Sequence, residues 1–423
     1  MSIQIIGNVN KNRLYCAGSF TKHLTTFVCL SLLAEQYDID AILDDADFFN
    51  RLCTQPSSKQ FLTVFQKIIG SDFTLHDICS YYTGLPYTFD LSEDEIEKVE
   101  MGLPFKHHTI PDEAAFLYRC HNKITPVYKN QCKFHYSELS ILFLGYLIEK
   151  VFDIKIETLF NDYLIEKFNL KNSYFSRKKV EDVYIEDLSD KYDYPSIAIL
   201  DHGYFCYSNG FYTTLNDTKR LLENIIETSV FHHMTDLKHA RAASGRLLNG
   251  LAIEIRLVGD DVLYGYEGLS FSGCNIWAYS TKQKKGVLTV TNDEEAAYNI
   301  YHALGYSSFD KVPEYTEIIY QSFIKQYTQI YHPIQKNIPT DYQGSYHRVN
   351  INEKILSIIF YVSENCIKIR NPDEIKYDIM FVNNAYRIQN KDMTHGTTVA
   401  FYQSDNGNKY MLFDGTLYIK IHE

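Results

Sequence analysis

The sequence lacks the short motifs by which several large enzyme classes are found. It contains no H-E-x-x-H zinc motif, no glycine-rich phosphate-binding loop and no G-x-S-x-G turn around a serine. Its nine cysteines are an odd number and include no C-x-x-C pair. We therefore expect free thiols in a reducing compartment rather than a disulfide framework. The adjacent pairs His107-His108 and His232-His233 would diverge on any regular element, so we expect neither a metal nor a cofactor.

Basic runs and long apolar runs are also missing. The chain has 41 basic and 53 acidic residues, a net charge of −12 and no basic stretch to neutralise a phosphate backbone, which argues against nucleic-acid binding. The longest apolar stretches, such as Leu139 to Ile148, are about half as long as a membrane helix needs, so we expect no membrane span. The amino terminus has no basic leader before an apolar segment. We expect a cytosolic protein, with export by a route that leaves no such signal as the open alternative.

The length of 423 residues is too great for one ordinary core and predicts two domains. Apolar residues at helical spacing predict helices at 19–36 and between 136 and 168. Alternating stretches at 252–258, 262–267, 275–280 and 286–291, joined by short turns, predict an antiparallel sheet. Short alternating stretches beyond residue 339 predict a small β-barrel or sandwich. We expect a domain over residues 1–310, a helical connector over 311–335 and a β domain over 336–423.

Ser19 and Lys22 stand three residues apart at the start of the first predicted helix. At this spacing they share one face of the first turn, so the lysine amine can reach the serine oxygen and make it a nucleophile. The dipole at this end of the helix favours a developing oxyanion. The alternative is structural, because serine is a preferred N-cap and a lysine there is usually solvated. Taken alone, the pair fits the cap better.

Three further segments follow this pair in order. They are Thr83-Gly84-Leu85-Pro86, Phe134-His135-Tyr136-Ser137-Glu138 and Tyr264-Gly265-Tyr266-Glu267-Gly268. Together with Arg13 to Lys22, they resemble the ordered motifs of the serine β-lactamase and penicillin-binding-protein-like hydrolases, closest to the class C β-lactamase, esterase and D-aminopeptidase branch. The resemblance spans residues 13 to 305 and implies an α/β (α+β) fold, an antiparallel sheet flanked by helices with an all-helical subdomain. The terminal β domain is similar to the lipocalin-like barrels appended to some relatives.

The resemblance implies a serine hydrolase that forms an acyl-enzyme on an ester, an amide or a small peptide. Ser19 would be the nucleophile, and Lys22 would help to remove its proton. Tyr136 would act as the general base toward the serine and later as the acid toward the leaving group. The backbone amides of Ser19 and Leu269 would form the oxyanion hole, where Gly268 permits a close approach of the backbone.

A second tyrosine competes with Tyr136 for this role. Tyr207-Ser208-Asn209 fits the family's Tyr-x-Asn pattern literally, whereas Tyr136-Ser137-Glu138 does not. The residues from Asn209 to Asp217, however, already resemble a later segment of the family. We therefore prefer Tyr136.

Two positions depart from the family's pattern. Glu138 replaces an asparagine, so it can accept from Lys22 but cannot donate to a substrate carbonyl, and its charge should hold Lys22 protonated. Tyr266 stands where relatives carry a lysine or histidine, which removes a cation that commonly meets a substrate carboxylate. Glu267 adds a negative charge beside it. We expect poor activity on carboxylate-bearing β-lactams and a preference for a neutral ester or a substrate with a free amine.

These departures keep a second function open, in which a catalytically impaired relative serves as a ligand- or protein-binding module. Only 18 residues precede Ser19, fewer than relatives use for an opening helix and strands. A sheet edge left unfilled there would pair with another chain and give a homo-oligomer. The expected partners are a small-molecule or peptide substrate and, through this edge, a second copy of the chain.

Overall fold

The fold is that of a computed structural model of the chain. It describes residues 2–5, 10–89, 112–126, 134–176, 180–185, 197–199, 203–244, 247–258, 261–270, 273–281, 284–291, 340–348, 359–363, 366–370, 375–382, 385–389, 395–403, 409–413 and 416–421. The helical connector predicted at 311–335 lies outside the described residues, as does a helix expected at 294–304.

Helix α1 (Phe20–Ala34) is the central element of the fold, and Ser19 immediately precedes it. All of its residues except Ala34 are buried, which is the pattern of a core helix rather than of a surface helix. It packs on strand β10 and on the helices α8, α10 and α12, whose bounds are given below. The helix ends where polar, exposed residues begin at Glu35, close to the predicted end at residue 36. Its first turn is therefore held from several sides at once.

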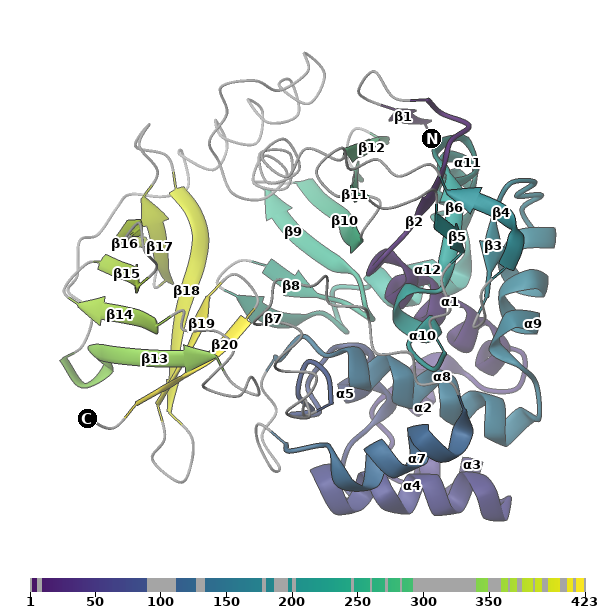
Figure 1. The fold of residues 1–423 in the computed structure, drawn as a ribbon, viewed down its shortest axis with the longest axis horizontal. Coiled ribbons are helices and arrows are strands. Elements are labelled where there is room, and N and C mark those ends of the chain that lie inside the picture. Colours follow the sequence, from purple (N-terminus) through teal and green to yellow (C-terminus); the bar gives the residue numbers. More distant parts are fainter. Residues whose placement is uncertain are drawn as a thin grey trace.

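A group of helices covers one side of α1 (Figure 1). They are α2 (Ile39–Leu43), α3 (Phe48–Leu52), α4 (Pro56–Ile69), α5 (Leu75–Cys79), α7 (Glu113–Asn122), α8 (Glu138–Phe152) and α9 (Ile156–Phe160), which a π-helical turn at Asn161–Glu166 continues. The amphipathic α4 begins with Pro56 in its first turn and buries Phe61 and Phe65. Both rings pack on Phe143 of α8, with centroid distances of 5.5 and 4.0 Å. This packing fixes α8, whose first residue is Glu138.

A seven-stranded sheet packs on α1 through β10. Its order is β1-β12-β11-β10-β9-β8-β7. The strands are β1 (Ser2–Ile5), β7 (Arg241–Ser244), β8 (Leu247–Asn249), β9 (Glu254–Val258), β10 (Asp261–Ser270), β11 (Gly273–Ser280) and β12 (Lys285–Thr291). All neighbours from β7 to β12 are antiparallel, which confirms the antiparallel sheet predicted between residues 252 and 291. Strand β1 pairs in parallel with β12 and so occupies the edge that the sequence left open.

A smaller sheet leads the chain into α1. Strand β2 (Leu14–Cys16) pairs with β6 (Phe211–Thr214), which also pairs with β3 (Tyr174–Phe175). The short helix α10 (Cys206–Asn209) precedes β6, and α11 (Leu215–Ile225) and α12 (Ser229–Thr235) follow it. A separate pair consists of β4 (Val180–Ile185) and β5 (Ile197–Ile199). The β2–β6 pairing brings residue 209 next to the start of α1.

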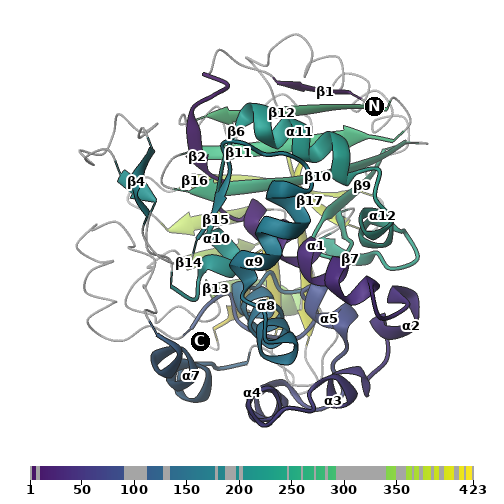
Figure 2. The same cartoon turned by 90° about the vertical axis from the view of Figure 1, so that its right-hand side faces the viewer.

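Eight further strands pair in sequence order, and the last pairs back with the first. They follow a 3₁₀ turn at Thr340–Tyr342 and are β13 (Gly344–Arg348), β14 (Ile359–Ser363), β15 (Cys366–Arg370), β16 (Ile375–Val382), β17 (Ala385–Gln389), β18 (His395–Gln403), β19 (Lys409–Phe413) and β20 (Thr416–Lys420). Figures 1 and 2 together place the seven-stranded sheet between these strands and the helices. The two groups of strands touch where β18 meets β7.

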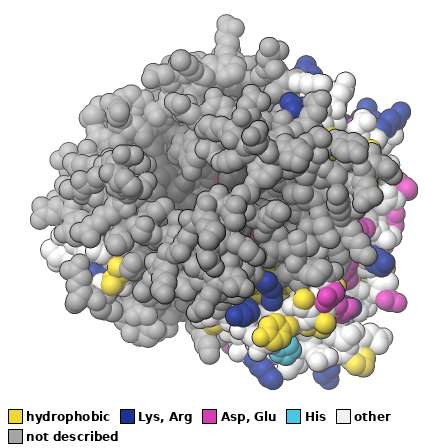
Figure 3. Space-filling model, viewed as in Figure 1, with side chains coloured by type: hydrophobic (Ala, Val, Ile, Leu, Met, Phe, Trp, Pro, Cys, Tyr) yellow, Lys and Arg dark blue, Asp and Glu magenta, His cyan; other side chains and the backbone are white. Residues whose placement is uncertain are grey.

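The described surface mixes charges of both signs. On the face in Figure 3, basic and acidic side chains alternate over the part of the surface that is not grey, without a single-sign patch there. Within the described residues, no helix combines the length and the apolar character that crossing a membrane requires.

Candidate active site

Ser19 stands between β2 and α1, at the end of a tight turn. Gly18 supplies the turn with a φ of +53°, a left-handed conformation that glycine adopts without strain. Ser19 is half-buried and occupies the N-cap position, yet within the described residues its side chain makes no capping bond. Its Oγ instead accepts a 2.8 Å hydrogen bond from Lys22 Nζ. The hydroxyl is thus directed to the lysine.

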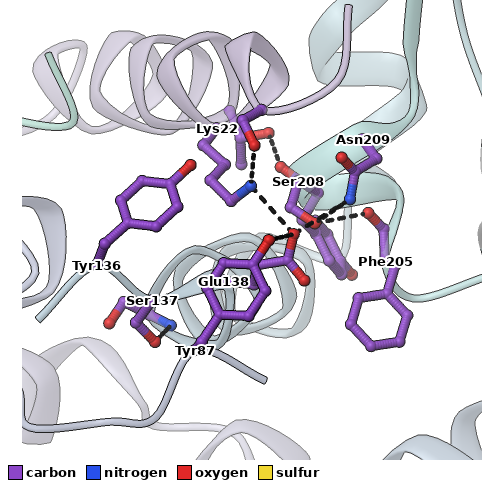
Figure 4. A network of polar contacts seen from close by, with 12 residues as sticks. Lys22, Tyr87, Tyr136, Ser137, Glu138, Phe205, Ser208 and Asn209 are labelled. Carbon is purple, nitrogen blue, oxygen red and sulfur yellow. Dashed lines mark hydrogen bonds and ion pairs between the residues drawn. The ribbon is translucent and has the colours of Figure 1, made fainter. Parts of the chain in front are cut away.

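Lys22 is the buried cation of the site, with a side chain that is 0% exposed. Its Nζ forms an ion pair with Glu138 Oε1 at 3.1 Å (Figure 4). Burial opposes the charge on Lys22, but Tyr136, Glu138 and Tyr87 together outweigh it and raise the pKa of this amine above its ordinary value. Lys22 is therefore protonated at neutral pH and donates to Ser19 as an ammonium group.

Glu138 collects donors from three parts of the chain. Besides Lys22, its Oε1 accepts from Asn209 Nδ2 at 3.3 Å and from the Tyr87 hydroxyl at 3.4 Å. Asn209 also donates to Ser208 Oγ at 2.9 Å, so its amide is oriented by two acceptors (Figure 4). Three donors on one oxygen favour an ionised carboxylate. The arrangement holds Glu138 and Lys22 as a charged pair.

Tyr136 lies beside this pair at the start of α8. Ser137 caps that helix by accepting from Ser140 N and also donates to Pro86 O at 2.6 Å, which fixes the entry of the chain. The Tyr136 ring centroid is 5.3 Å from Lys22 Nζ, and the ring stacks on Tyr87 at 6.0 Å (Figure 4). Like Ser19, Tyr136 is only half-buried. A substrate can therefore approach both side chains.

The competing Tyr207 points elsewhere. Its ring is buried against Gly145 of α8, where an added Cβ would come within 2.2 Å of it. Its hydroxyl donates to Glu149 Oε2 at 2.6 Å, and its carbonyl accepts from Thr25 Oγ1. Tyr207 thus serves the packing of α8, while Asn209 from the same segment reaches Glu138.

Tyr266 extends the site with a line of phenols. Its hydroxyl lies 3.3 Å from that of Tyr136 and 3.2 Å from that of Tyr81. Burial first, and then the two neighbouring phenols, raise the pKa of Tyr266 well above its ordinary value. Burial likewise raises the pKa of Tyr81, which holds a left-handed φ of +62° that is uncommon for a tyrosine. Both phenols remain neutral and able to donate at neutral pH.

Gly268 lies on β10 where this strand extends beyond β9. The pairing of β9 with β10 ends at Gly265, so the following residues face the turn before α1 instead. A Cβ on Gly268 would meet Ala17 O at 2.0 Å, which only glycine avoids. Asn275 Nδ2 donates to Ala17 O at 2.8 Å and to Gly268 O at 3.0 Å, and so joins the two segments. Leu269 follows in the strand, opposite Cys274.

Three residues of this site were not predicted from the sequence: Tyr81, Tyr87 and Asn209. Tyr81 and Tyr87 flank the Thr83-Gly84-Leu85-Pro86 turn, so the turn itself was the available signal. For Asn209 the signal was the literal Tyr-x-Asn match, of which only the asparagine reaches the site.

An antiparallel sheet packed on a buried helix, with a serine and a lysine in the first turn, defines a β-lactamase-like protein. The family model described as Beta-lactamase matches residues 4–305, and the chain belongs to this family. Among curated proteins, no sequence matches it.

Two solved structures resemble nearly the whole chain. The octameric penicillin-binding protein homologue from Pyrococcus abyssi has 18% identity and a TM-score of 0.52, with 97% of this chain and 89% of that chain covered. The structure of SurE with D-Leu has 12% identity and a TM-score of 0.55, with 98% and 88% covered. At these identities the likeness is one of fold.

Proposed function

We propose that this protein is a serine hydrolase that forms an acyl-enzyme at Ser19 on an ester, an amide or a small peptide. The observation that carries the proposal is the 2.8 Å hydrogen bond from Lys22 Nζ to the half-exposed Ser19 Oγ. A serine that served only as a cap would bond the backbone of its own helix instead. Membership in the Beta-lactamase family supports the same reaction class.

In the proposed reaction, Ser19 Oγ attacks the substrate carbonyl carbon and its proton passes to Tyr136. The new bond is Oγ–C, and the carbonyl electrons move to the oxygen. Tyr136 then returns the proton to the departing alcohol or amine as its bond to the acyl carbon breaks. Water repeats the sequence on the acyl-enzyme and releases the acid. Lys22 cannot be the base while Glu138 holds it charged, so its role is to stabilise negative charge on Oγ and on Tyr136.

The oxyanion hole of this proposal consists of the backbone amides of Ser19 and Leu269. The close approach of Gly268 to Ala17 O supports it, because it brings β10 against the turn that carries Ser19. Asn275 holds this spacing by bonding both carbonyls. The arrangement is rigid before substrate binds, which is what electrostatic stabilisation of an oxyanion needs.

The substrate that we propose is a neutral ester or a compound with a free amine. Tyr266 is neutral where a cation would meet a substrate carboxylate, and the charge of Lys22 is already balanced by Glu138. Glu267 adds a negative charge on the same strand. Rates of acylation by matched esters that differ only in a carboxylate or an amine test this preference, and faster acylation by the anionic ester would contradict it.

Intact-mass spectrometry after treatment with a serine-reactive fluorophosphonate and with a β-lactam tests the nucleophile. We expect one phosphonate adduct on the wild-type chain, none on Ser19→Ala and an unchanged adduct on Ser208→Ala. The Ser208 variant is the matched control, because its hydroxyl belongs to the same network but bonds Phe205 O. An adduct that persists in Ser19→Ala would place the reactive serine elsewhere.

The Lys22–Glu138 pair also favours a second candidate, a catalytically impaired relative that binds a ligand or a protein. Glu138 opposes a second negative charge on the neighbouring Tyr136, which the reaction requires. Absence of any adduct from the folded wild-type chain, with both probes, would favour this binding module over the enzyme.

We further propose the domain division of residues 1–310, 311–335 and 336–423, with a lipocalin-like barrel at the end. The closure of β13 to β20 in sequence order supports it. A homo-oligomer is proposed too, since one similar structure is described as octameric. Light scattering of the purified chain tests the oligomer, and two separate unfolding transitions would support the division. Seven described cysteines that are all free and buried support a reducing compartment, which cell fractionation tests.

A further inference from the structure

Asp40, His233 and His239 converge at a place that the proposed catalytic residues do not share. Asp40 lies on α2, His233 on α12 and His239 in the connection from α12 to β7. His233 Nδ1 is 3.0 Å and His239 Nε2 is 2.9 Å from Asp40 Oδ1. One potential ligand atom from each residue lies within 4.8 Å of the other two. The two histidines thus share one carboxylate oxygen between them.

We propose that these three residues form a binding site for a divalent transition-metal cation of the Zn²⁺ type. Two ligands at about 2.0–2.1 Å from a tetrahedral Zn²⁺ lie about 3.3 Å from each other, and both histidine nitrogens are already near that distance from Asp40 Oδ1. Imidazole nitrogens with one carboxylate are a ligand set that suits Zn²⁺ and disfavours Mg²⁺ and Ca²⁺. His232, by contrast, diverges from the group, as expected for the neighbour of His233 on a helix.

The ligands are held before any cation arrives. His239 is 7% exposed, and its carbonyl accepts from His76 Nε2 at 2.6 Å, while His76 Nδ1 contacts Asp44 Oδ1 at 2.8 Å. Asp40 follows Asp38, which caps α2 by accepting from the Asp40 amide. Polar contacts that orient the ligand-bearing segments are typical of metal centres. The exposed Asp40 and the half-buried His233 leave one side open for a fourth ligand from water.

Lys238 is the built-in competitor for this site. Its Nζ lies 2.6 Å from Asp40 Oδ2 and 3.3 Å from Asp236 Oδ2, so one ammonium bridges two carboxylates. A cation that takes Asp40 leaves Lys238 with Asp236 as its partner, and the ammonium is not left unpaired. Removal of the Lys238 charge should therefore strengthen metal binding, an effect opposite in sign to the loss of a ligand.

Isothermal titration with Zn²⁺, on the full chain without a polyhistidine tag, tests the site. We expect one Zn²⁺ per chain, at least tenfold weaker binding in His233→Ala, His239→Ala and Asp40→Asn, and unchanged binding in His232→Ala. Lys238→Met should bind several times more tightly. Wild-type melting temperature should rise with Zn²⁺ and not with Mg²⁺. Cobalt substitution gives a second readout, since Co²⁺ in the site should show the visible absorption of a tetrahedral centre.

Two results would overturn the proposal. One is the absence of Zn²⁺ binding in both the wild-type chain and Lys238→Met. The other is binding that His233→Ala leaves unchanged, because this half-buried side chain can be truncated with little effect on folding. If Asp40→Asn or His239→Ala fails to fold, the His233 and Lys238 variants decide the question by themselves.

Discussion

The hydroxyl of Tyr266 lies 3.3 Å from the hydroxyl of Tyr136 and is itself buried, with 4% of the residue exposed. Relatives of this chain are expected to carry a cation at this position, and a neutral phenol takes its place here. A buried phenol that donates to Tyr136 stabilises a negative charge there without bringing a full positive charge to the pocket. Tyr266 thus links the proposed base to Tyr81 rather than to a substrate carboxylate.

The first prediction concerns Tyr266→Phe. The variant removes one donor to a Tyr136 phenolate, and because hydrogen bonds to charged groups contribute about 1.5–3 kcal/mol, acylation should slow by roughly ten- to hundredfold. Tyr81→Phe is the matched control, since its hydroxyl is one step farther from Tyr136 and should affect the rate less. Stopped-flow acylation with a chromogenic ester measures both, and equal rates in all three proteins would contradict the role of the phenol line.

A second prediction separates Tyr136 from Tyr207. Tyr136→Phe should lower the acylation rate by about 10²- to 10⁴-fold, the range for loss of a general acid–base group, while leaving the melting temperature near that of the wild type. Tyr207→Phe should acylate normally but unfold more easily by about 1–3 kcal/mol, because Glu149 loses a buried donor. Loss of acylation only in Tyr207→Phe would reverse the assignment.

The buried ion pair yields a third prediction. Glu138→Gln leaves Lys22 buried without its carboxylate, which should lower the free energy of unfolding by about 3–5 kcal/mol at pH 7. Lys219→Gln breaks the exposed pair with Glu223 and should change it by about 0.5 kcal/mol or less. Urea denaturation measures both variants.

The same pair has a defined pH dependence. Folding raises the pKa of Lys22, so its contribution is complete below the unfolded value of about 10.5 and is lost as the pH rises through the higher folded value. The difference between the wild type and Glu138→Gln should therefore narrow above about pH 10.5. A difference that stays constant to high pH would show that Glu138 does not stabilise the ammonium.

His23 gives a fourth prediction, at acid pH. Burial lowers the pKa of His23 to about 4, although its Nδ1 bonds Ala252 O at 3.3 Å. The unfolded chain takes up a proton near pH 6.5 and the folded chain does not, so stability present at pH 7 is lost as the pH falls toward 4. The loss between pH 7 and pH 5 should be about 2 kcal/mol.

The variant His23→Leu should flatten this acid limb, whatever its own stability at pH 7. His232→Gln is the control, because His232 is exposed and the slope should remain that of the wild type. Denaturation curves at pH 5, 6 and 7 are sufficient. An unchanged slope in His23→Leu would assign the acid sensitivity to other groups.

The parts of the site that the sequence predicted are those fixed by local spacing. Ser19 and Lys22 meet because three residues of one helix separate them, and Gly268 could be placed by its motif on a strand. The contacts of Glu138 with Asn209 and Tyr87 span 71 and 51 residues, and no local pattern encodes such a meeting. For the fold, the sheet between residues 252 and 291 followed from alternation and short turns. Strand β1 could not be predicted, since four residues carry no periodic signal and the strand forms only by pairing with β12.

The single tryptophan of the chain lies at the seam between the sheet and α1. Trp277 is opposite Tyr266 in the β10–β11 pairing, and its ring centroid is 6.3 Å from Phe20 and 5.8 Å from His23. With 1% of the residue exposed, its emission reports a dry environment that exists only while β11 rests on α1. Intrinsic fluorescence of the unmodified protein therefore follows, through one chromophore, the integrity of the contact that sets Ser19 against β10.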